Sequence, residues 1–313
     1  MRKLLALLLT LWLAPAIAQV PMTGAGKGAP AVAPSYCGPG DGGSCNGTTG
    51  ALAFYSCGRA YNAAYANGTN PLCDLVAITG GAAVCTLRAA TTGYVDLTAY
   101  CPGSLTPSAA CAAASGGSCL ISKIYDQSGA SSCSGACDLA TTPGATTKPA
   151  LTFSALNSLP CVTTSGTSAL ATSGTIASQS APYSFTVVGK ITSATNGRWL
   201  VSGATQGGIL DNAANTVRMY AGSSLNATAS DASFHALVGT ANTTTTGAMV
   251  VDGSSTTGTT GTTAISSNIV MGTDSAGSSG IVAIFCEGGI WSGAINATNM
   301  NSNMHNVTSG WNF

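Results

Sequence analysis

Carboxylates and histidines carry most acid–base chemistry in proteins, and this chain contains few of them. It has one glutamate, Glu287, nine aspartates and two histidines, His235 and His305. Neither histidine has an acidic partner nearby in the sequence, the aspartates are scattered and no serine lies in a nucleophile elbow. We therefore expect no metal site, no cofactor and no Ser-His-Asp triad. Any acid–base chemistry in this chain would therefore depend on the carboxyl groups of Glu287 and the nine aspartates. Glu287 lies within an apolar strand pattern, where a structural role bonding a loop backbone is expected.

Charge is sparse along the whole chain. Charged residues make up 6% of the 313 residues, and 10 Lys+Arg balance 10 Asp+Glu, whereas about 25% is typical of soluble proteins. A nucleic-acid-binding surface needs clustered Lys and Arg, so this composition excludes nucleic acid as a partner. The hydrophobic share of 45% allows a sizeable core. Forty glycines and few helix-favouring residues predict an all-β fold with many turns.

The N-terminus has the pattern of an export signal. Arg2 and Lys3 precede an apolar stretch from Leu4 to Leu13, and Ala16-Ile17-Ala18 is typical of a cleavage site. A membrane anchor is the alternative, but the apolar stretch is too short to span a bilayer. We therefore interpret residues 1–18 as a signal peptide, 19–36 as a Gly/Pro/Ala-rich leader and 37–313 as one domain. The mature protein is expected to be secreted, extracellular or periplasmic, free of the membrane and monomeric.

Twelve cysteines in an exported chain predict disulfides. Eleven lie between Cys37 and Cys161, so complete pairing requires Cys286 to join one of them. Spacing makes several local pairs plausible without fixing the connectivity: Cys37–Cys45, Cys73–Cys85, Cys111–Cys119 and Cys133–Cys137. A zinc site at Cys133 and Cys137 is the alternative, but no second close pair or histidine completes it.

From about residue 150, apolar stretches alternate with Gly, Ser, Asn and Thr turns, which predicts a sandwich or barrel. The expected strands are Leu151–Phe153, Cys161–Thr164, Tyr183–Ile191, Trp199–Ser202, Gly208–Leu210, Val217–Ala221, Phe234–Thr240, Ala248–Val251, Asn268–Met271 and Ile281–Trp291. Short helices are expected at Ser56–Ala66 and Asn296–His305. The threonine-rich stretches 242–246 and 254–263 are interpreted as solvated loops flanking a hairpin.

The order of these strands resembles the concanavalin A-like (laminin-G-like) jelly roll. Phe234-His-Ala-Leu-Val-Gly, Met249-Val-Val-Asp-Gly and Ile281-Val-Ala-Ile-Phe-Cys-Glu-Gly-Gly-Ile-Trp are similar to its later strands. The resemblance implies an antiparallel β-sandwich that is disulfide-rich and has few short helices. In that fold the first strand of the sandwich lies beside the last. This adjacency implies a disulfide between Cys161 and Cys286.

The segment Cys119-Leu-Ile-Ser-Lys-Ile-Tyr-Asp-Gln-Ser-Gly129 narrows the resemblance. It is similar to a "C-L-I-T-x-I-Y-D-Q-S-G" segment in the catalytic domain of family-54 glycoside hydrolases, the α-L-arabinofuranosidase B type. Ala60-Tyr-Asn-Ala-Ala-Tyr, the Cys111–Cys119 pair and Ser275 to Gly288 fit the same family. The resemblance covers roughly residues 37–310.

Carrying the family's site over gives four candidate residues, each with an alternative. Asp274 matches the acid/base aspartate, and otherwise serves as an Asx-turn residue. Asp211 matches a substrate-binding aspartate and could replace the nucleophile, whose position falls on Ala213; otherwise it is a turn residue before a strand. Trp199 could stack on a sugar or belong to the core. Asp126 could line the pocket or hold a turn.

The resemblance implies a secreted enzyme that hydrolyses terminal non-reducing α-L-arabinofuranosyl groups of polysaccharide or oligosaccharide. The alternative is a non-catalytic, lectin-like module that binds glycan or a cell surface. Ala213, the absence of the family's adjacent cysteine pair and Thr273 in place of a glycine favour this alternative. A surface adhesin is a third interpretation, based on the Thr/Gly/Ser-rich composition alone.

Overall fold

The computed structural model describes residues 36–99, 101–130, 133–144, 146–193, 197–202, 207–211, 216–229, 232–306 and 310–313. The chain divides into two units, residues 1–34 and 35–313, and everything below concerns the second. The expected signal peptide 1–18, all of the leader except Tyr36, and Ala213 lie outside the described residues. No helix in the described ranges is long and apolar enough to cross a membrane.

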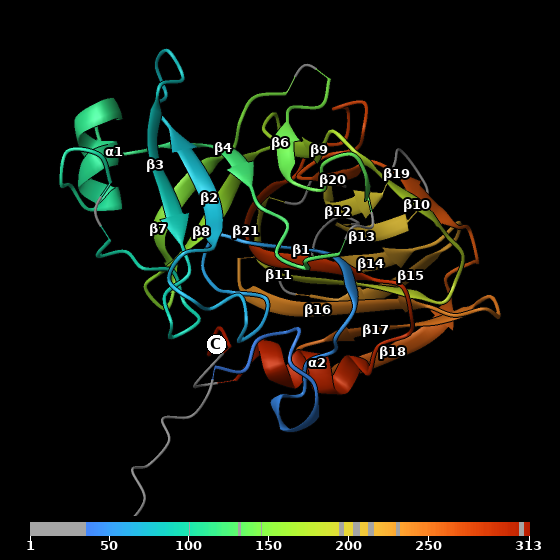
Figure 1. The fold of residues 1–313 in the computed structure, drawn as a ribbon. Helices are drawn as coiled ribbons and strands as arrows, with labels where there is room; N and C mark the ends of the chain where they lie inside the picture. The colour runs from blue at the N-terminus through green and yellow to red at the C-terminus, as the bar shows by residue number, and fades with distance from the viewer. Residues whose placement is uncertain are drawn as a thin grey trace, which may run out of the picture. The chain divides into compact units, whose positions relative to one another are not determined.

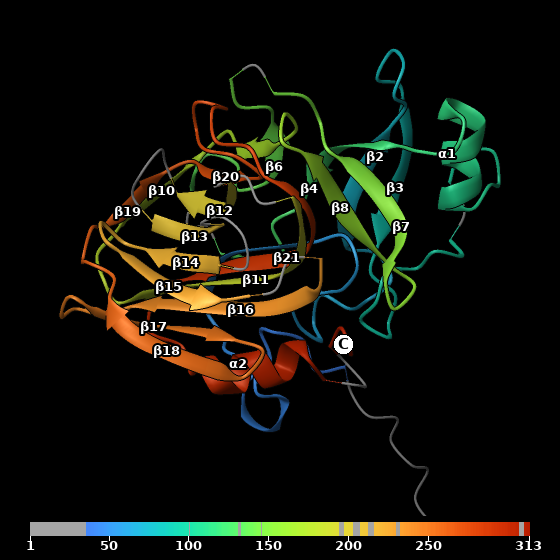
Figure 2. The ribbon, with the colours of Figure 1, turned by 180° about the vertical axis from the view of Figure 1, so that it is seen from behind.

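One antiparallel sheet of 18 strands, folded into two layers that we call the first and the second sheet, forms the body of the structure (Figures 1 and 2). The first sheet has the order β18 (Ser254–Thr259), β17 (Thr246–Val251), β16 (Phe234–Ala241), β11 (Tyr183–Ser193), β21 (Val282–Trp291), and β1 (Ala51–Ser56) also pairs with β21. The second sheet has the order β15 (Ser224–Thr228), β14 (Thr216–Tyr220), β13 (Gly207–Asp211), β12 (Arg198–Ser202), β20 (Ile269–Met271), β9 (Leu170–Thr172), β6 (Leu139–Thr141). The expected antiparallel sandwich is confirmed.

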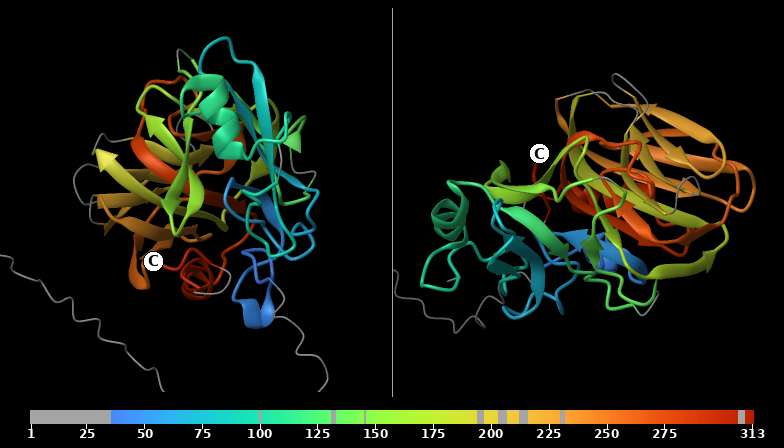
Figure 3. Two further views of the ribbon diagram at one scale, coloured as in Figure 1. Left: turned by 90° about the vertical axis from the view of Figure 1, so that its left-hand side faces the viewer. Right: turned by 90° about the horizontal axis from the view of Figure 1, so that it is seen from above.

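The first sheet continues past β21 into the N-terminal half of the chain. The added strands run in the order β8 (Leu159–Ser165), β7 (Ala150–Leu156), β4 (Leu120–Ile124), β2 (Pro71–Val76), β3 (Ala83–Arg88). Helix α1 (Pro107–Ser115) packs near β3, and Figure 3 shows this blue-green part at the opposite end from the orange strands. A small sheet of β19 (Ile265–Ser267), β10 (Thr175–Gln179) and β5 (Cys133–Ser134) and a 3-10 turn at Gly43–Cys45 complete the elements.

Alternation along β11 shows how the sandwich is filled. Tyr183, Phe185 and Val187 lie in the main core, whereas Val188 belongs to a separate apolar cluster. That second cluster includes Met300 and Met304 of α2 (Ala297–Met304), which packs against β16 and β17 (Figure 1). Because successive side chains of a strand point to opposite faces, the first sheet is buried on both sides here.

All ten strands expected from residue 150 onward are confirmed, as is the helix near the C-terminus. The helix expected at Ser56–Ala66 is wrong: Ser56 ends β1, and turns with an isolated bridge at Arg59 follow. The loop expected at 254–263 is also wrong in part, because residues 254–259 form β18 against β17. Asp252 and Gly253 both have positive φ, 46° and 84°, as a tight hairpin turn requires, and threonine suits a strand.

Six disulfides join all twelve cysteines. The Cys161–Cys286 bond and the local pairs Cys37–Cys45, Cys111–Cys119 and Cys133–Cys137 are confirmed. The pair Cys73–Cys85 is wrong, because the bonds are Cys57–Cys73 and Cys85–Cys101. The register explains this: Cys73 pairs with Leu87 across β2 and β3, and Cys85 pairs with Leu75, so the two cysteines are not opposite each other.

Candidate functional site

Asp274 lies in the loop between β20 and β21 and is only 5% exposed. Its Oδ1 accepts hydrogen bonds from the amides of Ala276 and Ser278, at 3.1 and 2.8 Å, and its Oδ2 accepts one from the Ser278 hydroxyl at 2.7 Å. Burial acts to raise the pKa of Asp274, but the bonds from Ser278 and Ser279 and the charge of Arg198 together lower the pKa below its ordinary value. The carboxylate is therefore ionised near neutral pH, in the geometry of an Asx turn.

Arg198, the first residue of β12, is the cation beside this loop. Its Nε lies 3.8 Å from Asp274 Oδ2, and its side chain is 18% exposed. The Arg198 Nε and the Thr273 Oγ1 are buried atoms for which the described part of the chain supplies no hydrogen-bond partner. Buried polar atoms are nearly always hydrogen-bonded, so these two mark places where a buried water would bind.

Strand order brings Asp211 to the same edge as Arg198 and the Asp274 loop. Asp211 is the last residue of β13; its neighbour Leu210 pairs with Arg198, at the start of β12. On the other side of β12, Leu200 pairs with Met271, which ends β20. The side chain of Asp211 and the following residues 212–215 lie outside the described residues.

Trp199 has a different position. It is 2% exposed and belongs to the core between the sheets. Its ring packs against Gly189 of β11 so closely that a Cβ there would lie 2.1 Å from the Trp199 Cζ3. This position agrees with the alternative that Trp199 belongs to the core. Its ring has no exposed face on which a sugar could stack.

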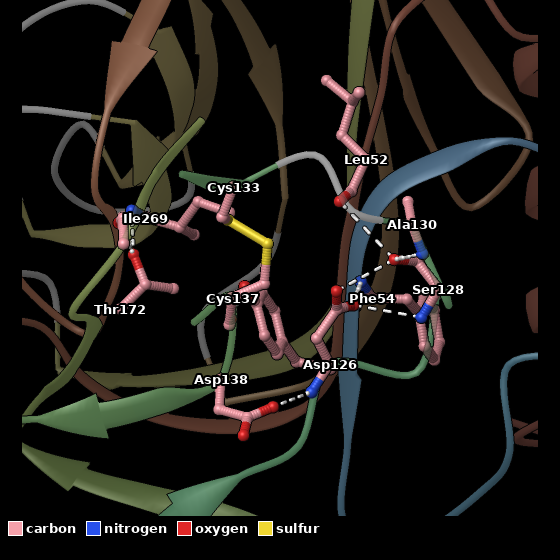
Figure 4. Close-up of a disulfide and its surroundings, with 12 residues drawn as sticks. Leu52, Phe54, Asp126, Ser128, Ala130, Cys133, Cys137, Asp138, Thr172 and Ile269 are labelled. Atoms are coloured by element: carbon pink, nitrogen blue, oxygen red, sulfur yellow. Dashed lines mark hydrogen bonds between the residues drawn. A yellow bond between two sulfur atoms is a disulfide. The ribbon is translucent and has the colours of Figure 1, made fainter. Parts of the chain in front are cut away.

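Asp126 holds a turn (Figure 4) and lies away from Asp274, Arg198 and Asp211. Its Oδ1 accepts hydrogen bonds from the Phe54 and Ser128 amides, both at 3.0 Å, and its Oδ2 accepts one from the Ser128 hydroxyl. It also lines a cavity of about 410 Å³ together with Asp138 and the Cys133–Cys137 disulfide. Burial raises the pKa of Asp126 to about 6, against the lowering effect of the bonds from Phe54 and Ser128.

The single glutamate of the sequence is buried and forms an ion pair. Glu287 of β21 is fully buried; its Oε2 lies 2.5 Å from the Arg59 Nε, and its Oε1 accepts a bond from the Arg59 Nη2 at 2.7 Å. The Trp311 indole donates a further bond to Oε2 at 2.7 Å. Glu287 thus has the expected structural role, although its partners are side chains and not a loop backbone.

Both histidines meet a single aspartate, which corrects the expectation that they lack acidic partners. The Asp252 Oδ2 lies 2.5 Å from the His235 Nδ1, and its Oδ1 lies 3.2 Å from the His305 Nε2. No local pattern in the sequence shows this, because the partners are 17 and 53 residues apart. Among the described residues, no group of three or more His, Cys, Asp or Glu side chains could hold a metal ion.

Comparison with known proteins finds similarity in structure alone. No protein-family profile matches the chain, and no curated protein matches its sequence. One similar solved structure is an arabinofuranosidase complexed with arabinofuranosyl-alpha-1,2-xylobiose: 18% identity, TM-score 0.59, covering 83% of this chain and 63% of that one. Another is a GH54 α-L-arabinofuranosidase soaked with a cyclic sulfate inhibitor: 16% identity, TM-score 0.60, with the same coverage. The protein therefore has a GH54-like fold and spans less than two thirds of the length of these neighbours.

Proposed function

We propose that this protein binds arabinofuranosyl-bearing polysaccharide at the edge of the second sheet where Asp211, Arg198 and the Asp274 loop meet. The observation that supports this most is a GH54-like fold over 83% of the chain, with those residues at one edge. A guanidinium beside an ionised carboxylate offers a donor and an acceptor for sugar hydroxyls.

The state of Asp274 favours binding over acid catalysis. A general acid must carry a proton at the working pH, and the pKa of Asp274 is lowered by the bonds from Ser278. Both of its oxygens already accept bonds from its own loop. Glu287, the one glutamate, is already engaged in a buried ion pair with Arg59. Binding without cleavage is thus the function that the described geometry supports best.

Hydrolysis of terminal α-L-arabinofuranosyl groups, with retention, is the second candidate. It is favoured by the convergence of Asp211 and Asp274 on one edge of one sheet. In this scheme Asp274 would protonate the leaving oxygen, and Asp211 would attack the anomeric carbon. Six disulfides fit an oxidising compartment for either function and support an extracellular protein. We further propose, from the sequence pattern, that the protein is released by cleavage after residue 18 and is monomeric.

Binding is tested by calorimetry with an arabinose-substituted xylan and with the same xylan after its arabinose has been removed. The proposal expects binding to the first ligand only, with a loss of at least tenfold in affinity for Asp274→Asn and for Arg198→Met. Asp96→Asn is the matched control, because Asp96 also accepts hydrogen bonds from two amides of its own loop. That loop lies far from Asp274 in the sequence. Equal affinity for both xylans would refute the proposal.

Hydrolysis is tested by arabinose release from 4-nitrophenyl α-L-arabinofuranoside. Activity that disappears in Asp274→Asn and Asp211→Asn but persists in Asp96→Asn would establish the second candidate. Arabinose-dependent binding with no release by the wild type would establish the first. If the wild type neither binds nor cleaves, both candidates are wrong.

A further inference from the structure

Two cavities outside the Asp274 edge contain carboxylates that are already engaged. Asp126 lines one cavity, and its oxygens accept bonds from its own turn and from β1. Asp74 lines a cavity of about 440 Å³, and its oxygens accept bonds from the Thr86 and Tyr125 hydroxyls at 2.6 and 2.8 Å. The cluster around Asp252 differs from both, because its bonding pattern requires a particular protonation state.

Three elements meet at Asp252. The residue lies in the turn between β17 and β18, and its Oδ1 accepts a bond from the Ala236 amide of β16 at 2.8 Å. His235 of β16 bonds to Oδ2, and His305, which caps the end of α2, lies against Oδ1. One carboxylate thus connects the edge of the first sheet to the helix that covers it.

The hydrogen bonds of His305 identify its protonation state. Its Nε2 lies 3.2 Å from a carboxylate oxygen of Asp252, and its Nδ1 lies 2.9 Å from the main-chain oxygen of Phe313. Both partners are acceptors. A neutral imidazole has a single N–H, so it can donate to only one of them, and both bonds together require the imidazolium form.

We propose that His305 and Asp252 form a proton-operated clasp, which fastens the end of α2 and Phe313 to the β17–β18 turn when His305 is protonated. Deprotonation of His305 removes one of its two bonds and its ionic attraction to Asp252. The clasp then loosens at that end of the helix.

The surrounding charges raise the pH at which His305 loses its proton. The bond to Asp252 raises the pKa of His305, against the lowering effect of burial, and the bonds to the two histidines hold the pKa of the partly buried Asp252 well below its usual range. The titratable groups that face the clasp are Asp252 from the turn, His235 from β16, His305 from α2 and the main-chain carboxyl group of Phe313, the last residue of the sequence. The Nζ of Lys190, from β11, lies over the ring of Phe234, the residue before His235.

The two pKa shifts determine how the stability that the clasp contributes changes with pH. A raised pKa in the folded state gives stabilisation that is complete below the unfolded pKa of about 6.5 and is lost as the pH rises through the folded value. A lowered pKa of Asp252 gives stabilisation above its unfolded value of about 4, lost only in strong acid. The clasp is therefore fully stabilising from about pH 4 to 6.5 and opens above that.

Opening remains local because other contacts hold the helix. Met300 and Met304 are fully buried against the outer face of the first sheet. Asn301 donates a bond to the Ala236 carbonyl at 2.9 Å. Loss of the clasp should thus free the last turn of α2 while the helix stays in place.

A cavity of about 480 Å³ adjoins the clasp and includes His235, Asp252, Ser254 and Thr256 in its lining. When His305 loses its proton, the positive charge beside Asp252 disappears. The wall of this cavity therefore becomes more negative as the clasp opens.

Proton NMR tests the clasp directly, because the chain has only two histidines to resolve. His305 should titrate above 6.5, and its pKa should move towards that ordinary value in Asp252→Asn. Amide exchange at the end of α2, corrected for intrinsic rates, should accelerate severalfold between pH 6 and pH 8 in the wild type. This acceleration should be absent in His305→Lys, which keeps the charge at both pH values.

Ser302→Ala is the matched control on the same helix, because its hydroxyl bonds only within α2, to the Thr298 carbonyl. It should keep the wild-type response to pH. If Asp252→Asn fails to fold, His305→Lys and the wild-type titration still decide the question. A His305 pKa below 6.5, or the same acceleration of exchange in His305→Lys, would overturn the proposal.

Discussion

Replacing Glu287 by glutamine tests whether the buried ion pair holds the fold or serves chemistry. The substitution keeps the shape of the side chain and removes its negative charge. Arg59 would then be a fully buried cation whose bonds to both carboxylate oxygens, at 2.5 and 2.7 Å, are weakened or lost. Burial alone lowers the pKa of Arg59, and it is Glu287 that raises it above its ordinary value.

The expected cost is large because the charge cannot reach water. Breaking a buried ion pair by removing one partner costs about 3–5 kcal/mol, most of it from the charge left uncompensated. Trp311 also loses an ionised acceptor for its indole N–H, which holds the C-terminal residues against β21. We therefore expect Glu287→Gln to lower the free energy of unfolding by about 4 kcal/mol.

Equilibrium unfolding in urea, with the disulfides intact, measures this loss. The double variant Arg59→Met, Glu287→Gln is the control, because it removes the stranded cation and should recover more than about 1 kcal/mol relative to the single variant. A single variant within about 1 kcal/mol of the wild type would refute the structural role. If the Glu287→Gln variant were as stable as the wild type but had lost arabinose release, Glu287 would take part in the reaction.

Three further predictions concern other parts of the sandwich. Replacing Cys161 and Cys286 by alanine opens a link between residues 125 apart and should cost about 5 kcal/mol in urea unfolding; a loss under about 1 kcal/mol would contradict the loop-entropy argument. Gly189→Ala places a Cβ 2.1 Å from the Trp199 ring and should cost about 1–3 kcal/mol, whereas wild-type stability would disprove the packing. Folded Asp126 keeps its proton up to a pKa of about 6, against 3.8 for the free group, so wild-type stability should fall as the pH rises between these values. The Asp126→Asn variant should lack this slope, and an unchanged slope would show that another group causes it.

Ten strands from residue 150 onward were predictable because apolar runs separated by turn residues mark them one by one. The short or polar strands β9, β10, β15, β18 and β19 have no such apolar run and were not predicted. The N-terminal strands β1 to β4 were not, since disulfides and side-chain networks position that region. Ser56–Ala66 shows the difference. Its alanines and tyrosines resemble a helix face, but the Cys57–Cys73 bond and the buried Arg59 hold the segment as turns.

The candidate site was predictable as far as the backbone determines it. The resemblance placed Asp211 and Asp274 in one site, and strand pairing brings β13, β12 and β20 to one edge. The bonds from Ser278 that fix the charge of Asp274 depend on loop geometry, which residue spacing does not encode. The meeting of His235 and His305 on Asp252 depends in the same way on tertiary packing.

A bulge in β21 explains why its glutamate cannot serve the Asp274 edge. Opposite β11, Glu287 pairs with Val188 and Phe285 pairs with Gly189, so Cys286 is the extra residue. Phe285 lies in the main core, whereas Cys286 lies in the outer cluster, and Glu287 bonds to Trp311 of that same cluster. With regular alternation, Glu287 would follow Phe285 into the apolar core.

The bulge therefore moves the only glutamate to the outer face of the first sheet, where Arg59 and Trp311 neutralise and cover it. Asp274 lies in the loop that leads from β20 of the second sheet to β21 of the first. Two carboxyl groups must lie within about 10 Å of each other to cleave a glycosidic bond by either stereochemical route. Because Glu287 is held by Arg59, any hydrolysis at the Asp274 edge would need an aspartate as its second carboxylate. Asp211 ends β13, which is separated from β20 by β12.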